Sequence, residues 1–212
     1  MSSSADAGEA PVPTAVVFDL GGVLVDWDPR YLYRQLLPED EIEDFLAEVD
    51  FSAWNYRADA GGRWADVIAE QSARFPHRAA LLAAYPERFR ETLGGEVPGT
   101  VQLLRDLHTA GVRLLALTNW SAETFPRARG LFPFLDWFEG IVVSGDERIR
   151  KPDPEIWRRT IERFQLDPAT TVYIDDMPRN AEVAASLGFR AVRFESPEQL
   201  RTQLVELGVL TA

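Results

Sequence analysis

Thr14-Ala15-Val16-Val17-Phe18-Asp19-Leu20-Gly21-Gly22 is the stretch of this sequence that decides the fold. An apolar run typical of a fully buried strand ends at Asp19, and the glycine pair after it permits close approach to the backbone. Three more polar signals follow apolar runs: Thr118-Asn119, Arg150-Lys151-Pro152 and Asp175-Asp176. Because ligands of open α/β sheets bind outside the carboxyl ends of parallel strands, we expect the four signals to form one active site.

The second half of the chain alternates between helical and strand patterns. Helices are expected at 100–110, 122–130, 154–164 and 178–187, and strands at 112–117, 140–144, 171–174 and 191–194. Such alternation implies right-handed crossovers and a parallel sheet. We therefore predict an α/β fold with a Rossmann-like parallel sheet core and helices on both faces, to which the strand at 14–19 also belongs.

A helical insert separates that first strand from the others. Helices are expected at 29–36, 39–49, 63–74 and 79–92, and the aromatic and charged segment 54–62 is expected to be a loop. Glycines and a proline between 94 and 99 predict a hinge. The predicted organisation is a disordered tail over residues 1–13, an α/β core over 14–28 and 96–212, and a small all-α domain over 29–95.

Composition excludes several classes of function. The formal net charge of −12 argues against nucleic acid or an anionic membrane as a partner, since both attract basic surfaces. The absence of cysteine excludes disulfides, thiolate nucleophiles and cysteine-bound zinc. Residues 1–13 hold no signal-peptide pattern. We expect a cytoplasmic protein, either a monomer or a homodimer.

The polar signals suit phosphoryl transfer. Asp19, at a strand end, can act as a nucleophile that forms an aspartyl-phosphate. Thr118 and Asn119 lie between a strand and a helix, where a hydroxyl and an amide can hold phosphoryl oxygens or simply cap the helix. Lys151, whose backbone Pro152 restricts, can balance the charges of nucleophile and phosphate.

The acidic pair Asp175-Asp176 indicates a cation. Two negative charges at the end of an apolar strand are costly unless a cation compensates them, although a solvated acidic turn is the alternative. Carboxylate oxygens suit Mg²⁺, which we expect as the cofactor. Asn180, in the first turn of the following helix, is expected to orient the two carboxylates.

In order and spacing, the signals resemble the four motifs of the haloacid dehalogenase-like superfamily. The residues concerned are Phe18-Asp19-Leu20-Gly21-Gly22-Val23-Leu24, Leu117-Thr118-Asn119, Arg150-Lys151-Pro152-Asp153-Pro154 and Ile174-Asp175-Asp176. The insert is similar to that family's cap, and the chain resembles its small sugar-phosphate phosphatases, including those acting on glucose 1-phosphate. The resemblance implies that Asp19, the Gly21 carbonyl and Asp176 hold the metal, with Asp175 acting through water.

One position departs from the family's pattern. Many of its phosphatases carry a general acid two residues after the nucleophile, where this chain has Gly21. Loss of a positioned acid typically slows catalysis by about 10² to 10⁴. Asp26 and Asp59 are the candidates for a substitute.

Substrate choice is expected to lie in the cap. Side chains of the segment 54–62 could stack on a sugar ring, bond its hydroxyls or clamp an anion; they are Trp54, Asn55, Tyr56, Arg57 and Asp59. Gly22 admits substrate close to the backbone. The alternative for Trp54 and Tyr56 is that they pack the cap onto the core.

Three functions therefore compete. The favoured one is a Mg²⁺-dependent phosphatase of a small phosphorylated metabolite, in which Asp19 is the nucleophile and Thr118, Asn119 and Lys151 hold the phosphoryl group. A 2-haloacid dehalogenase would use the same aspartate without metal, but the acidic pair Asp175-Asp176 argues against it. A binding protein without turnover is the third, and Gly21 is its support.

Overall fold

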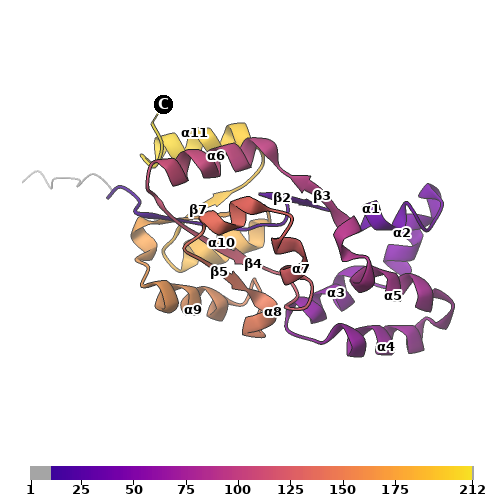
Figure 1. Ribbon diagram of the computed structural model, residues 1–212. Coiled ribbons are helices and arrows are strands. Elements are labelled where there is room, and N and C mark those ends of the chain that lie inside the picture. Colours follow the sequence, from indigo (N-terminus) through magenta and orange to yellow (C-terminus); the bar gives the residue numbers. More distant parts are fainter. Residues whose placement is uncertain (1–10, 212) are drawn as a thin grey trace, which may run out of the picture.

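The computed structural model describes residues 11–211, so most of the predicted disordered tail lies outside the described residues. At its centre is a five-stranded parallel sheet with the strand order β5-β4-β1-β6-β7 (Figure 1). The strands are β1 (Ala15–Phe18), β4 (Arg113–Thr118), β5 (Gly140–Val143), β6 (Thr171–Asp175) and β7 (Arg190–Arg193). The predicted α/β fold is confirmed.

Strand β1 is the middle of the sheet, which explains its unbroken apolar sequence. It pairs in parallel with β4 on one side and β6 on the other, and all four of its residues are buried. A strand covered on both faces has no solvent side for polar residues. The register aligns Phe18 with Ala116 and Ile174, so the residues that follow β1, β4 and β6 emerge at the same edge.

Helices cover both faces of the sheet. On one face α6 (Pro98–Thr109) and α11 (Pro197–Glu206) pack against each other and share an apolar core with Val16 and Phe18. On the other face α9 (Pro154–Phe164) and α10 (Pro178–Ser186) share a second core with Val17. Two short helices, α7 (Phe125–Arg129) and α8 (Ser144–Glu147), lie after β4 and β5.

The insert is a separate helical body beside the sheet (Figure 1). Its α-helices are α1 (Pro29–Tyr33), α2 (Glu39–Glu48), α3 (Phe51–Asp59), α4 (Trp64–Arg74) and α5 (Ala79–Glu87), with 3₁₀ turns at Pro76–Arg78 and Phe89–Thr92. We call this body, residues 29–92, the cap. None of the helices between residues 11 and 211 has the length and hydrophobicity that a bilayer-spanning segment requires.

The loop predicted at 54–62 is wrong, because most of it belongs to α3. Five residues of this helix are buried: Phe51, Trp54, Asn55, Ala58 and Asp59. Their spacing of three and four is that of one helix face. Asn55 and Asp59 obscure this pattern in the sequence, since both are polar residues on the buried face.

The segment 94–99, which the sequence predicts as a hinge, consists mainly of regular secondary structure. Leu93–Glu96 forms strand β3, which pairs antiparallel with β2 (Val25–Trp27), and helix α6 begins at Pro98. The backbone at Gly94 packs against the side chains of Asp26 and Tyr31, where a Cβ atom would collide with both. Gly94 therefore allows close packing in a two-stranded ribbon that joins the cap to the core.

Candidate active site

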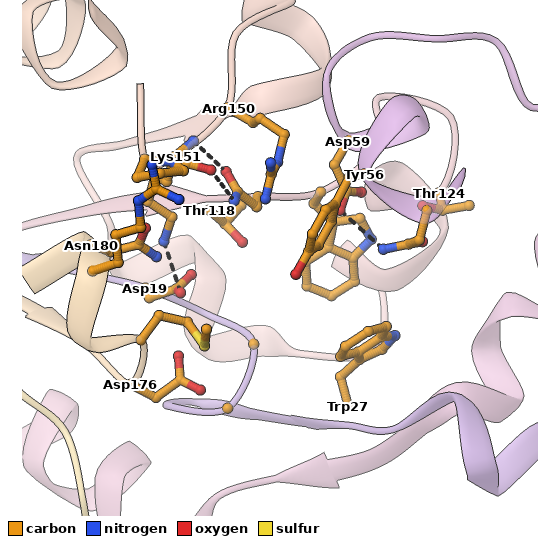
Figure 2. Close-up of a pocket in the computed structure, with 18 of the residues that line it drawn as sticks. Asp19, Trp27, Tyr56, Asp59, Thr118, Thr124, Arg150, Lys151, Asp176 and Asn180 are labelled. Carbon is orange, nitrogen blue, oxygen red and sulfur yellow. Dashed lines mark hydrogen bonds and ion pairs between the residues drawn. The ribbon is translucent and has the colours of Figure 1, made fainter. Parts of the chain in front are cut away.

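A cavity of about 480 Å³ lies where the cap meets the carboxyl ends of the central strands. Figure 2 shows Asp19, Lys151, Asp176 and Asn180 on one side and Tyr56, Asp59 and Thr124 on the other. The first group comes from the core and the second includes side chains of cap helix α3. The four polar signals of the sequence thus meet in one cavity.

Lys151 is the centre of the polar side. Its ammonium lies 2.8 Å from Asp19 Oδ2 and 2.6 Å from Asp175 Oδ2, and it donates to the carbonyl of Leu117 at 3.0 Å. The side chain has no exposed surface. Burial lowers the pKa of Lys151, but the two carboxylates more than offset this and raise it, so the lysine carries its charge.

Asp175 uses all of its hydrogen-bonding capacity inside the protein. Oδ2 accepts from Lys151 Nζ and from the Tyr173 hydroxyl at 2.6 Å each, and Oδ1 accepts from the Met177 amide and Asn180 Nδ2 at 2.9 Å each. Burial raises the pKa of Asp175, but Lys151 and these hydrogen bonds bring it below the ordinary value. Asp175 is therefore an ionised carboxylate held in place, with Asn180 orienting it.

The carboxylates of Asp19 and Asp176 have fewer hydrogen-bond partners than that of Asp175. Burial raises the pKa of Asp19 to about 8 although Lys151 opposes the shift, and burial together with Asp175 raises the pKa of Asp176. Oxygens of these two carboxylates and of Asp175 lie within 4.8 Å of one another. Such a concentration of negative charge is the situation that a bound cation relieves.

The glycine turn after Asp19 brings the backbone up to this cluster. Both Gly21 and Gly22 line the cavity. Gly22 adopts φ of +75°, and a Cβ there would lie 2.7 Å from Asp176 Oδ2. Glycine is required at this position on both grounds. Thr118, at the end of β4, is buried and lines the same part of the cavity.

The side chain of Asn119 forms hydrogen bonds with the backbone of Lys151. Oδ1 accepts from the Lys151 amide at 2.8 Å, and Nδ2 donates to the Lys151 carbonyl at 3.0 Å. Both ends of the side chain are thus bonded to the backbone of the lysine. Asn119 therefore positions Lys151, and the contact of its amide with a phosphoryl group stays a prediction, since Nδ2 has a second hydrogen and the residue lines the cavity.

The cap contributes a polar pair at the other end of the cavity. Asn55 Nδ2 donates to Asp59 Oδ2 at 3.1 Å, and burial raises the pKa of Asp59 to about 7 against the opposing effect of Arg150. The Arg150 guanidinium lies over the ring of Tyr56 at 3.8 Å. Ser144 of the core donates to the Asp59 carbonyl at 2.6 Å, so the cap is in contact with the core here.

Two residues predicted to bind substrate lie elsewhere. Trp54 is buried among the rings of Phe51, Trp64 and Tyr85, and it does not line the cavity. Arg57 forms an ion pair with Glu70 on the surface of the cap. On helix α3, Arg57 projects from the exposed face, whereas Trp54 shares the buried face but packs within the aromatic core of the cap.

Most of the aromatic cavity wall is not predicted by the sequence, with the exception of Tyr56. The aromatic residues that line the cavity are Trp27, Tyr56, Trp64, Tyr85, Phe89 and Trp120. They come from the ribbon, from α3 to α5, from the 3₁₀ turn and from the segment after β4, so no local pattern joins them. Lys151, which the sequence does predict, is also marked by composition, because it is the single lysine of a chain that otherwise uses arginine.

Known proteins resemble this chain along most of its length. A family model described as haloacid dehalogenase-like hydrolase matches residues 13–188. A sesquiterpene phosphatase of Aspergillus oryzae is 27% identical over 176 residues, which cover 82% of this chain and 86% of that protein. Phosphoglycolate phosphatase of Nitrosospira multiformis is 30% identical over 194 residues, covering 84% of this chain and 82% of the relative.

A solved structure shares the whole architecture. The HAD family enzyme of Bacteroides thetaiotaomicron in complex with magnesium superimposes with a TM-score of 0.69 and 20% sequence identity. The superposition covers 88% of this chain and 95% of that enzyme. At this level of identity the likeness establishes the shared fold, including the helical body beside the sheet.

Proposed function

This chain belongs to the haloacid dehalogenase-like hydrolase family, and from that premise we propose that it is a Mg²⁺-dependent phosphatase of a small phosphorylated metabolite. The observation that carries the proposal is the cluster of Asp19, Asp175 and Asp176 around a buried lysine. The phosphatases among its relatives, including the sesquiterpene phosphatase and phosphoglycolate phosphatase, support the same class of reaction.

The residues present fit a magnesium ion. Asp19 and Asp176 would hold it, together with the carbonyl of Gly21, since their oxygens are the hard ligands that Mg²⁺ prefers. Asp175 would support the site from outside, because its four hydrogen bonds leave it no free lone pair for direct ligation. A bound Mg²⁺ supplies positive charge that stabilises the phosphoryl oxygens in the transition state.

In the proposed reaction the Asp19 carboxylate attacks the phosphorus of the substrate. The bond between phosphorus and the leaving oxygen breaks and an aspartyl-phosphate forms; the leaving oxygen takes a proton from Asp59 or from water, which gives the free alcohol. Water then attacks the phosphorus of this intermediate, which releases inorganic phosphate and restores the carboxylate. Of the two carboxyls offered as substitutes for the missing general acid, Asp59 lines the cavity and Asp26 instead accepts a hydrogen bond from Tyr31 at 2.8 Å.

The side chains of the core prepare the nucleophile for this step. The amide of Leu20 donates to Asp19 Oδ1 at 2.7 Å, and Lys151 binds Oδ2, so the carboxylate is held in one orientation. The ammonium of Lys151 also favours the ionised form that the attack requires. Thr118 is proposed to donate its hydroxyl to a phosphoryl oxygen from the end of β4.

Two other functions were considered. A 2-haloacid dehalogenase would leave Asp176 without a cation, although this residue lines the cavity. A binding protein without turnover would not need a lysine buried between two aspartates. The geometry favours the phosphatase over both.

The decisive experiment is an assay of phosphate release from a panel that includes glucose 1-phosphate, other sugar phosphates and an acyl phosphate. The expected result is release that requires Mg²⁺, stops with EDTA and is absent in Asp19→Asn. Asp26→Asn serves as the control, because this carboxyl lies close in sequence but outside the cavity lining. Activity retained by Asp19→Asn would refute the nucleophile, and activity in EDTA would refute the metal.

The remaining expectations about partners and location stay predictions. A small phosphorylated metabolite is the proposed substrate, and a sugar phosphate follows from the resemblance alone. A cytoplasmic location, the monomeric or homodimeric state and the absence of nucleic-acid or membrane partners rest on composition.

A further inference from the structure

The half of the cavity away from the carboxylate cluster has walls of aromatic rings. The residues are Trp27, Tyr56, Trp64, Tyr85, Phe89 and Trp120. Both the cap and the core supply them, so this compartment is complete only when the cap lies against the core. Whatever occupies it is attached to the phosphoryl group held at the other end.

The polar atoms of these walls do not face the open space. Trp64 Nε1, Trp120 Nε1, the Tyr85 hydroxyl and the Thr124 hydroxyl have almost no accessible surface and no hydrogen-bond partner. The rings of these walls pack on one another: the Trp64 and Tyr85 ring centres are 5.4 Å apart, and Trp120 packs edge-on against Phe125 at 5.6 Å. The surface offered to a ligand is therefore mainly ring carbon.

Few polar side chains remain in this compartment. Asn55 donates to Asp59, and the Arg150 guanidinium lies over the ring of Tyr56. A sugar would bring several hydroxyls that need partners, and each one left unbonded on burial is costly.

The cavity has room for a small-molecule substrate. Its volume of about 480 Å³ is typical of ligand-binding pockets, which span roughly 300–1,000 Å³. A second hollow of about 360 Å³ adjoins it at Trp27, Asn55 and Tyr56, which line both spaces.

We infer that the substrate is the phosphate ester of an apolar alcohol, whose hydrocarbon group is seated among these rings. This inference rests on the proposed phosphatase function and replaces the sugar that the sequence suggests. The physical reason is that burial of hydrocarbon against ring carbon is favourable, whereas the compartment offers few partners for hydroxyl groups.

The test compares citronellyl phosphate with glucose 6-phosphate. Both are esters of primary alcohols and have leaving groups of similar size, so differences in leaving-group chemistry are small. With Mg²⁺ present, KM for citronellyl phosphate is expected to be at least about tenfold lower. An equal or lower KM for glucose 6-phosphate would overturn the inference while leaving the phosphatase standing.

A matched pair of variants locates the effect. Trp27→Leu is expected to raise KM for citronellyl phosphate by about tenfold, whereas Trp137→Leu, a half-buried tryptophan outside both cavities, should leave it unchanged. If both variants behave alike while their thermal unfolding midpoints match the parent protein, the rings are not the binding surface and the inference fails.

Failure of the proposed function can be told apart from failure of this inference. If neither ester nor an acyl phosphate releases phosphate, binding of the two esters to Asp19→Asn is measured by tryptophan fluorescence and calorimetry. Saturable binding of citronellyl phosphate with no binding of glucose 6-phosphate would support the apolar compartment without turnover. Binding of neither ester, or of both equally, would overturn it.

Discussion

Replacing Lys151 by methionine is expected to destabilise the protein in a manner that depends on pH. Methionine has a similar length and fills the same space, but it removes the ammonium between Asp19 and Asp175. Both carboxylates are then buried without their cation. Removing one partner of a buried ion pair typically costs about 3–5 kcal/mol of unfolding free energy, and that is the loss expected at pH 8.

The sign of the pH dependence follows from Asp175. Its pKa lies below the ordinary value in the native protein, so ionisation of this carboxylate contributes stability above the unfolded pKa, and that stability is lost as pH falls. Without Lys151 the burial of Asp175 dominates and its pKa rises. The variant then loses stability as pH increases from about 4, so the difference from the parent protein is larger at pH 8 than at pH 5.

The measurement is urea unfolding at pH 5 and pH 8 in EDTA, followed by tryptophan fluorescence. Arg158→Met is the control, since Arg158 forms an exposed ion pair with Glu155 at 3.6 Å and its removal should cost less than about 1 kcal/mol. A loss that is equal at the two pH values, or one as small as the control's, would refute the argument that Lys151 compensates two buried charges.

Three more changes follow from the site. Asn119→Ala should lower kcat by at least about tenfold with little change in KM, because it frees the backbone of Lys151; an unchanged kcat in the phosphate assay would remove the positioning role. Asp59→Asn should raise the unfolding free energy at pH 8 by at most about 4 kcal/mol and have little effect at pH 4. The reason is that the pKa of Asp59 is raised to about 7 in the native protein, which therefore loses stability as pH rises from the pKa of an unfolded aspartate to 7. Urea unfolding at both pH values checks this, and a destabilised variant at pH 8 would contradict it. Gly22→Ala should weaken Mg²⁺ binding by about tenfold or more, since the new Cβ meets Asp176 and the left-handed backbone disfavours alanine. The Mg²⁺ dependence of the unfolding midpoint measures the affinity, and equal affinity in the variant would show that the turn can relax.

The sequence predicted well what a single segment determines. Apolar runs such as Val16 to Phe18 mark strands that are buried on both faces, and Pro154 marks the first residue of α9, whose predicted and observed bounds agree. The meeting of Asp19 with Lys151 and Asp175 also followed, because it depends only on the topology of a parallel sheet.

What could not be predicted depends on contacts between distant segments. Helix α3 could not be recognised from its sequence pattern, because polar Asn55 and Asp59 lie on its buried face. These two residues line the cavity, which the sequence does not reveal. Strand β3 forms because it pairs with β2, which the whole cap separates from it in the sequence. The partners of Asn119 lie 32 residues away, so a motif that places it beside Thr118 says nothing about where its amide points.

Lys151 is the single lysine of the chain and has no exposed surface, and this combination gives amine chemistry an unusual selectivity. In the folded protein this ammonium is shielded from an amine-directed reagent. Labelling of Lys151 requires the side chain to leave its site between the aspartates. The kinetics of that modification, followed by mass spectrometry, therefore measure how often this site opens, without any engineered probe.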